Sequence, residues 1–455
     1  MHRPPPSDVR RGLVASTWEG AFAQAFMVLT GGVFLVDFAR RLGADDAALG
    51  LLAALPFLAQ SAQVGTAWVY ERVHAGRATI TAVTLVAARL LWLLPAALAL
   101  ASFADGSRLV LYLVVVALSA LLTTAGAHGW TSWMTDLVPP RVRGRYFGFR
   151  AAVCAFVAIA AGYGGGLLLE AGEAAGAGRG FAAVYVLGAL AGVGAWFAMK
   201  RQHHPLPHRE GPRPPFRALW HETWRKPENR RIFLFFGVWN VAVGMGAPFW
   251  QDYMRRELSM AAWEIGLQNN VGAIVGVAFA PWWGRMVDRA GVRPVLFANA
   301  ACIALIPFLW LLCGPGTVWP VWLDAFVVGI FWTGFNLTAL NVPISAAPRR
   351  GAAVFLGVFS AVTGLAFGLS CIASGLVAKA LGPGPHVVLG GAFAVHQVMF
   401  LASGVLRLAA IPFALQLPDP KAKRIVFLFN LMGYAVRHRL NLGRQILTAP
   451  WRKRT

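Results

Sequence analysis

Residues 262–313 read AWEIGLQNNVGAIVGVAFAPWWGRMVDRAGVRPVLFANAACIALIPFLWLLC, two apolar stretches separated by a short basic segment. A helix needs about 20 mostly apolar residues to cross a bilayer. Both stretches are long enough. Because a backbone in lipid must satisfy its own hydrogen bonds, they are predicted to be helices, over 262–284 and 293–313. The segment between them is then a loop at one membrane surface.

The same pattern recurs along the whole chain of 455 residues. Hydrophobic residues make up 57% of it and charged residues only 13%, whereas a soluble domain has about a quarter of its residues charged. The composition therefore excludes an ordinary soluble enzyme and predicts an all-α integral membrane protein. We predict twelve spans: 13–38, 47–70, 78–101, 109–134, 147–169, 181–199, 231–253, 262–284, 293–313, 319–343, 354–379 and 387–413.

Charge predicts the orientation. The chain has 41 basic and 19 acidic residues, a net charge of +22. Most of the basic residues outside the spans lie on the side that holds both termini. Because loops rich in Lys and Arg stay in the cytoplasm, both termini are predicted to be cytoplasmic in a multi-pass protein of the cell (inner) membrane. No soluble basic module is present, so nucleic acid is not an expected partner.

The spans fall into two halves. We predict an N-terminal half over 1–199, a cytoplasmic linker with a short interfacial helix over 200–230, a C-terminal half over 231–417 and a basic tail with an amphipathic helix over 418–455. Landmarks repeat between the halves in the same order: DFARR at 37–41 matches DYMRR at 252–256, and Arg143-Gly144 matches Arg350-Gly351. Six spans in each half predict a parallel repeat about an axis along the membrane normal.

The loop GRMVDRAGVR at 284–293 resembles the G-x-x-x-D-R-x-G-x-R signature of the major facilitator superfamily. The segments beginning at Pro140 and Pro348 resemble that superfamily's loops before spans five and eleven. The resemblance implies two six-helix halves that carry a solute by alternating access. The chain departs from proton-linked drug exporters of the superfamily, because its fourth span has no Arg and its fifth has no Gly-Pro pair.

The loop carries candidates for gating. Asp288 stands near a helix end, where a carboxylate can bind arginines such as Arg141, Arg143 and Arg145 or the positive end of a helix dipole. If that contact exists only when the cytoplasmic side is closed, the loop is part of a gate; otherwise it is a structural staple. The gating candidates are Glu71, Arg72, Arg143, Gly284, Asp288, Arg289, Gly291, Arg293 and Arg350.

Ionisable residues inside spans are costly and are functional candidates. Glu19 in span one and Asp324 in span ten are candidates for proton coupling; the alternative is an interfacial position for both. Arg89 lies near the middle of span three and keeps its charge. It is either a structural partner of Glu19 or a clamp for an anionic substrate.

Polar and aromatic residues in the spans complete a candidate cavity, although each alone could make only an interhelical hydrogen bond. The substrate-binding candidates are Arg89, His128, Trp133, Trp239, Asn240, Gln268 and Asn336. His396 and the four cysteines are interpreted as structural. We expect no catalytic residue, metal or cofactor.

The predicted function is secondary active transport of a small organic solute by alternating access. Export of an amphipathic compound is favoured because the candidate cavity is aromatic and poor in charge, with protons as a candidate coupling ion. The alternatives are uptake of an organic anion and a sensor or scaffold that kept the fold without transporting. An enzyme is not expected, since the chain has no Walker A, G-x-S-x-G or H-E-x-x-H sequence. The expected partners are the solute, the lipid bilayer and protons, and the expected state is a monomer.

Overall fold

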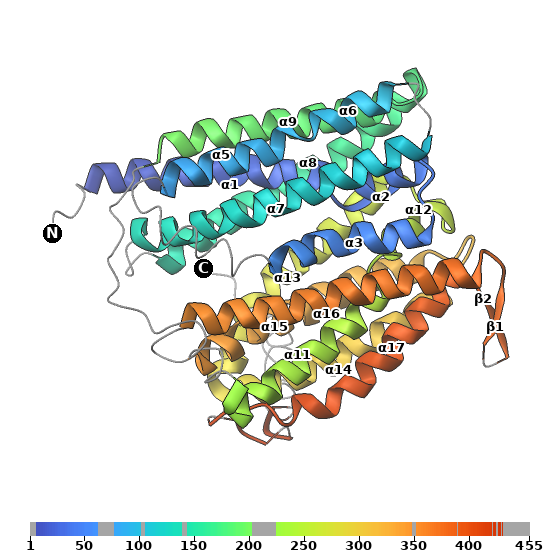
Figure 1. Ribbon diagram of the computed structural model, residues 1–455. Helices are drawn as coiled ribbons and strands as arrows, with labels where there is room; N and C mark the ends of the chain where they lie inside the picture. The colour runs from blue at the N-terminus through green and yellow to red at the C-terminus, as the bar shows by residue number, and fades with distance from the viewer. Residues whose placement is uncertain are drawn as a thin grey trace, which may run out of the picture.

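The computed structural model describes residues 6–61, 77–101, 105–138, 143–202, 224–347, 352–388 and 390–420, with 422–424, 426–428 and 430 in the tail. Long helices dominate it (Figure 1). The first half contains α1 (Pro6–Leu29), α2 (Gly32–Arg41), α3 (Asp46–Ser61), α5 (Arg77–Leu90), α6 (Leu93–Leu100), α7 (Asp105–Leu137), α8 (Arg143–Ala175) and α9 (Arg179–Lys200).

The second half is also helical, apart from one small hairpin. It contains α11 (Pro227–Gly246), α12 (Trp250–Arg256), α13 (Ala262–Ala290), α14 (Val292–Leu309), the 3₁₀ turn η2 (Trp310–Leu312), α15 (Trp319–Ala346), α16 (Ala352–Leu381) and α17 (Val395–Ala414). The hairpin pairs β1 (His386–Val388) with β2 (Gly391–Phe393), antiparallel, with His386 opposite Phe393.

The described helices account for the predicted spans. Ten helical stretches are long and apolar enough to cross a membrane, some of them made of two consecutive helices. The short apolar helix α3 and the more polar α13, which is 29 residues long, correspond to spans two and eight. The interfacial helix predicted in 200–230 falls mostly outside the described residues, as does most of the tail helix.

The start of the twelfth span differs from its prediction. The span was predicted to begin at residue 387, but His386–Val388 and Gly391–Phe393 pair as strands and the helix begins only at Val395. Pro383, Pro385 and Gly390, whose φ is +82°, interrupt the chain there. Apolar composition was read as helix, whereas these residues favour turns.

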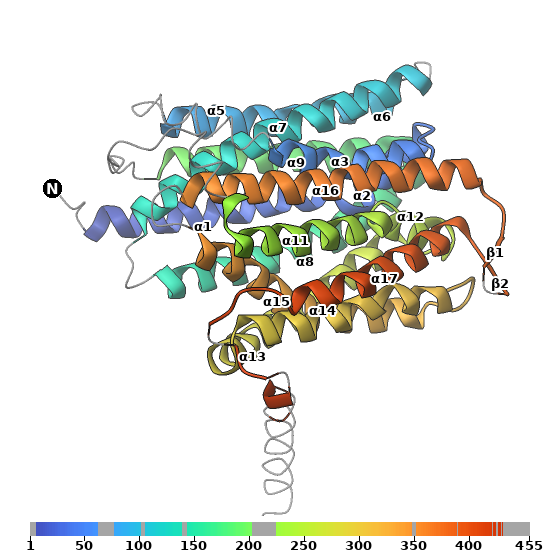
Figure 2. The ribbon, with the colours of Figure 1, turned by 60° about the horizontal axis from the view of Figure 1, so that its bottom comes forward.

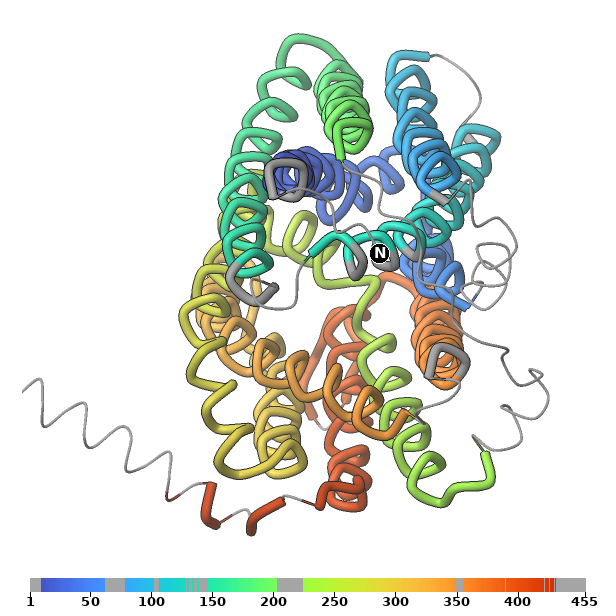
Figure 3. The backbone as a smooth tube through the Cα atoms, turned by 90° about the vertical axis from the view of Figure 1, so that its left-hand side faces the viewer, coloured from blue at the N-terminus to red at the C-terminus, as the bar shows by residue number. Residues whose placement is uncertain are grey.

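The helices form two bundles, with blue to green helices in one group and light green to red helices in the other (Figures 1 and 3). The bundles meet where α3 packs on α16, α8 on α13 and α2 on α12. Glycines allow the close approach: a Cβ on Gly50 would lie 2.9 Å from the Cα of Gly375, and one on Gly266 would lie 2.8 Å from the carbonyl oxygen of Gly162. Small residues at such contacts are typical of helix packing in membranes.

Spans one and seven are broken at matching places. α1 gives way to α2 at residues 30–31, and α11 gives way to α12 at residues 247–249. Gly32, with φ of +52°, supports the first break, and Pro248 lies in the second. The repeated segments 37–41 and 252–256 follow the two breaks. We call the side with these segments and the hairpin the far side, and the opposite side, where α1 begins and α9 ends, the terminus side (right and left in Figure 1).

Candidate gate and buried charge sites

On the far side, one arginine joins the two bundles. Arg40 of α2 reaches Asp252 of α12 through two bonds: Nε donates to Oδ1 at 2.9 Å and Nη2 to Oδ2 at 2.5 Å. The same Nη2 also binds Asp46 at the start of α3. Asp252 is buried, with 1% of its side chain exposed. Paired arginine–carboxylate bonds of this kind are among the stronger hydrogen bonds in proteins.

The second copy of the repeat makes the converse contact. Arg255 of α12 donates from Nε to Oδ2 of Asp37 in α2 at 3.1 Å, and its Nη1 lies 3.8 Å from Oε1 of Glu170 in α8. Asp37 and Asp252 are equivalent in the repeat, as are Arg40 and Arg255. Each copy therefore offers its acid to the other copy's arginine. The repeat is visible in the sequence, but the contact between its two copies is not.

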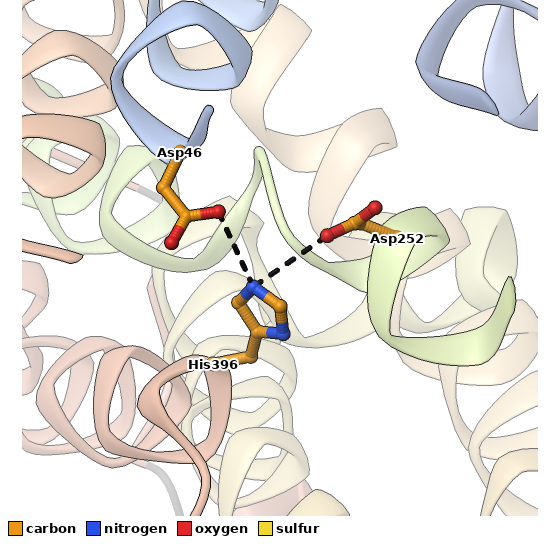
Figure 4. A group of neighbouring side chains, drawn as sticks. All are labelled: Asp46, Asp252 and His396. Carbon is orange, nitrogen blue, oxygen red and sulfur yellow. Dashed lines mark ion pairs between the residues drawn. The ribbon is translucent and has the colours of Figure 1, made fainter. Parts of the chain in front are cut away.

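A histidine faces the first of these contacts (Figure 4). Nε2 of His396 in α17 lies 3.5 Å from Oδ2 of Asp252 and 3.7 Å from Oδ1 of Asp46. The ring is buried and stacks on Phe249. Three potential metal ligands thus lie within 4.8 Å of one another. However, Arg40 already supplies positive charge to both carboxylates, so we interpret the group as a charge cluster.

A more exposed pair also joins the bundles on this side. Nζ of Lys379 in α16 lies 2.8 Å from Oδ2 of Asp45. The hydrogen bond from Lys379, helped by the backbone N–H of Ala48, lowers the pKa of the Asp45 carboxyl. Both side chains are largely in contact with solvent, so we expect this pair to contribute little.

On the terminus side, the described residues form no such contact. Between residues that the structure describes, the ion pairs that join the two bundles all lie on the far side. Asp288 and Arg289, near the end of α13, are exposed there. Within the described parts of the chain, the Asp288 carboxylate makes neither an ion pair nor a hydrogen bond.

The remaining gating candidates have separate surroundings. Gly291, with φ of +94°, joins α13 to α14, and nothing lies within 4 Å of a Cβ placed on Gly284. The backbone N–H of Arg293 donates to Oδ2 of Asp419, and its Nη1 donates to the carbonyl of Leu417. The other candidates fall outside the described residues or have undescribed side chains: Glu71, Arg72, Arg143 and Arg350. Gating by this set stays a prediction.

Inside the first bundle, Glu19 lies between two arginines. Its Oε1 is 3.5 Å from Nη2 of Arg89, and its Oε2 accepts a hydrogen bond from Nη2 of Arg150 at 3.0 Å. Nη1 of Arg89 also donates to the carbonyl of Gly192 at 3.4 Å, which places Arg89 in the interior of the bundle, among α1, α5 and α9. The expected contact of Glu19 with Arg89 is therefore present. Arg150, which also lies over the Trp130 ring, was not anticipated.

Inside the second bundle, Asp324 is less completely paired. Its Oδ2 accepts a hydrogen bond from Nε2 of Gln268 at 3.3 Å, and its buried Oδ1 has no hydrogen-bond partner. Only 6% of the residue is exposed, so the side chain is buried within the protein. Nη1 of Arg407 donates to the carbonyl of Ile303 at 3.3 Å.

The remaining substrate-binding candidates do not gather in one place. Trp133 lies in the core of the first bundle, and Trp239 stacks on Phe335 in the core of the second. Asn240 donates to the carbonyl of Phe236 in its own helix. Asn336 is exposed on α15, and the side chain of His128 is outside the described residues. Gln268 alone joins another candidate, Asp324.

The chain matches the model of one protein family over most of its length. The model described as Major Facilitator Superfamily matches residues 18–371. The chain belongs to the major facilitator superfamily. It is therefore a multi-pass membrane protein and a transporter with a small-molecule substrate, not an enzyme.

Solved transporters have the same fold. The nucleoside transporter NupG aligns with a TM-score of 0.65 and 13% identity, over 89% of this chain and 98% of that one. A bacterial homologue of the human lysosomal transporter Spinster, inward-facing and unoccupied, aligns with 0.62 and 16%, over 92% and 98%. An inward-facing bacterial homologue of the iron transporter ferroportin aligns with 0.62 and 13%, over 91% and 99%. No curated protein matches the sequence.

Proposed function

We propose that this superfamily member carries a small organic solute by alternating access as a secondary transporter in the inner membrane, and that the far-side contacts are its outer gate. The observation that supports this most is the reciprocal pairing of Asp37 with Arg255 and of Arg40 with Asp252. With both termini in the cytoplasm, as the charge distribution predicts, the structure is an inward-facing state. Two of the similar solved structures are also inward-facing.

The free energy of these hydrogen bonds is large enough to shift the ratio of closed to open far-side states. A hydrogen bond to a charged group contributes about 1.5–3 kcal/mol. A change of 1.4 kcal/mol shifts a two-state ratio tenfold. The far-side bonds join separate bundles, so they must break when the bundles part at that end. They therefore stabilise the closed far side without holding either bundle together.

For coupling to protons we propose Asp324 in preference to Glu19. Glu19 has a cation at each carboxylate oxygen, so its surroundings already balance its charge. Among the described residues, one buried oxygen of Asp324 has no hydrogen bond of normal geometry, and the cation that acts on this carboxylate is the buried Arg407. A carboxyl in this position could hold and release a proton. In this proposal the proton moves inward through Asp324 while the solute is exported.

The test is flux in sealed proteoliposomes. A thermal-shift screen of metabolites and drugs first supplies a solute that stabilises the purified protein. Wild type should then move that solute against its gradient when a proton gradient is applied. Asp324→Asn should lose this gradient-driven flux and keep solute exchange, whereas Glu257→Gln, an exposed acid on the far side, should keep both. Binding without flux would overturn transport, and gradient-driven flux in Asp324→Asn would overturn the coupling role.

One observation favours uptake of an organic anion as a second candidate. The cluster in the first bundle has two arginines and one carboxylate, and Arg150 lies against Trp130 with 18% of its side chain exposed. The excess positive charge suits a carboxylate or phosphate on the solute. Arg150→Gln should then raise the KM for an anionic solute about tenfold or more and leave a neutral solute unaffected. Equal effects on both solutes would exclude this role.

A further inference from the structure

A second feature lies on the terminus side, away from both charge clusters. A cavity of about 220 Å³ opens where α14 begins, α17 ends and the tail passes. α14 and α17 lie side by side (Figures 1 and 2). The lining residues are Arg293, Pro294, Phe297, Leu415, Lys423 and Arg424.

The tail is fixed against the bundle at this point. The backbone N–H of Lys423 donates to the carbonyl of Ala290 at 2.9 Å, and Oδ2 of Asp419 accepts from the N–H of Arg293 at 2.9 Å. Farther on, Leu428 is fully buried in a cluster with residues of α13 and α14 such as Trp283 and Val295. The tail therefore forms one wall of the cavity.

The charge of the cavity is positive. Arg293, Lys423 and Arg424 line it. Lys423 and Arg424 are exposed, and no carboxylate among the described residues forms an ion pair with either of them. Asp419 contacts the backbone of Arg293 nearby, so three cations face one acid. This excess suits an anion.

The apolar part of the lining fits a lipid. α14 and α17 are both membrane-spanning helices, so their ends mark the membrane boundary on this side. Pro294 and Phe297 lie in the first turns of α14. The apolar side chains of Val405 and Leu408 on α17 and of Leu415, which follows it, are 53%, 42% and 45% exposed, as expected of a face against acyl chains. A soluble anion has no apolar part that could pack against this surface.

We propose that this cavity binds the phosphate headgroup of an acidic phospholipid from the surrounding bilayer. The phosphate lies among Arg293, Lys423 and Arg424, and the acyl chains run along the exposed apolar face of α17. Basic pockets between helices on the cytoplasmic side are suited to such headgroups. The bound lipid would tie the tail to the second bundle, independently of which solute is carried.

The test measures lipid binding in the absence of solute, so its outcome does not depend on the transport proposal. Phosphatidylglycerol or phosphatidylcholine is added to the purified full chain in neutral detergent, and retained lipid is measured by native mass spectrometry together with the melting temperature. Glycerol phosphate and inorganic phosphate are tested in parallel. Wild type should retain phosphatidylglycerol and melt higher with it, and the other three compounds should do neither.

The variant Lys423→Gln/Arg424→Gln removes two lining charges. Since each basic residue near an anionic lipid surface contributes about 1 kcal/mol, two of them correspond to a loss of affinity of about thirtyfold. The control Arg230→Gln/Arg231→Gln removes the same charge from exposed positions at the terminus end of α11 and should bind like wild type. Equal losses in both variants would show only general attraction and overturn the site. Equal stabilisation by glycerol phosphate or phosphate would also overturn the lipid proposal.

Discussion

The two ends of the interface between the bundles are built differently. On the far side, Arg40, Asp252 and their repeat equivalents exchange charges between the bundles, and His396 and Asp46 add to the first pair. On the terminus side, the described residues form no ion pair between the bundles, and Asp288 is exposed. An interface that is bonded at one end only can open at the other without losing those bonds. In the transport cycle that we propose, the far side is therefore the end that this conformation closes.

The largest expected effect comes from a charge cluster that does not join the bundles. Arg89→Leu leaves Glu19 buried with one of its two partners and should reduce the free energy of unfolding by about 3–5 kcal/mol. Adding Glu19→Gln should recover part of that loss in a double-mutant cycle. Because the pair lies within one bundle, the ratio of open to closed states should not change. Strictly additive stability losses would show that the contact has no energetic role.

The second largest effect should appear in the ratio of molecules with an open far side to molecules with a closed far side. Asp252→Asn keeps the shape of the side chain and removes the charge that Arg40 and His396 share. The far side should open in at least about tenfold more molecules. Spin labels at Gly106 and Trp319, exposed far-side positions in the two bundles, report the distance by double electron–electron resonance.

The matched control for that experiment is Glu257→Gln. It removes the same charge five residues farther along, at an exposed position without an ion pair in the described chain. Its distance distribution should match that of wild type. If Asp252→Asn lowers the melting temperature and leaves the distances unchanged, the contact supports the fold and is not a gate.

Asp288→Asn tests the other end. In the conformation described here the carboxylate is exposed and forms no ion pair with a described residue, so its loss should leave this state unaffected. It should weaken only a state with the terminus side closed, shifting the ratio toward the present state by about fivefold, as expected for one exposed ion pair. Spin labels at Phe149 and Arg285 report the distance between the bundles on the terminus side. A lower melting temperature with an unchanged ratio would identify the loop as a staple.

The smallest effect should come from Lys379→Gln. The pair with Asp45 is exposed, so the closed far-side population should fall by only about twofold at pH 7. The pKa of Asp45 is lowered in the folded protein, so the contribution is present above the ordinary aspartate value of about 3.9 and is lost as the pH falls through the lowered pKa. A tenfold change in the closed population at pH 7 would mean that this pair, and not the buried one, dominates the gate.

Hydropathy predicted the spans because a bilayer imposes a minimum apolar length whatever the neighbours are. It was wrong at the start of the twelfth span, where Pro383, Pro385 and Gly390 interrupt the apolar sequence and two short strands pair before the helix. The contact of Glu19 with Arg89 was also predictable, since two charges buried in one bundle need partners. Arg150 was missed because it lies near the start of α8, close to the predicted loop.

The far-side cluster was not predictable in the same way. The repeat located both segments, but the exchange of charges between them depends on how the bundles pack, and no local pattern contains that information. His396 is one of several polar residues in an apolar span, and nothing in the local sequence distinguishes it from Gln397 or Ser403. Its role becomes visible only when α17 brings it to Asp46 of α3 and Asp252 of α12.

The exchanged pairs have the form of an isologous dimer interface folded into one chain. In such an interface residue i of one subunit contacts residue j of the other, and the same contact occurs again with the subunits exchanged. Here the segment with Asp37 and Arg40 takes the place of one subunit, and the segment with Asp252 and Arg255 takes the place of the other. A self-complementary segment of this kind forms each contact twice. One D-x-x-R sequence, present in both halves of the chain, therefore supplies both the acids and the arginines of the two ion pairs.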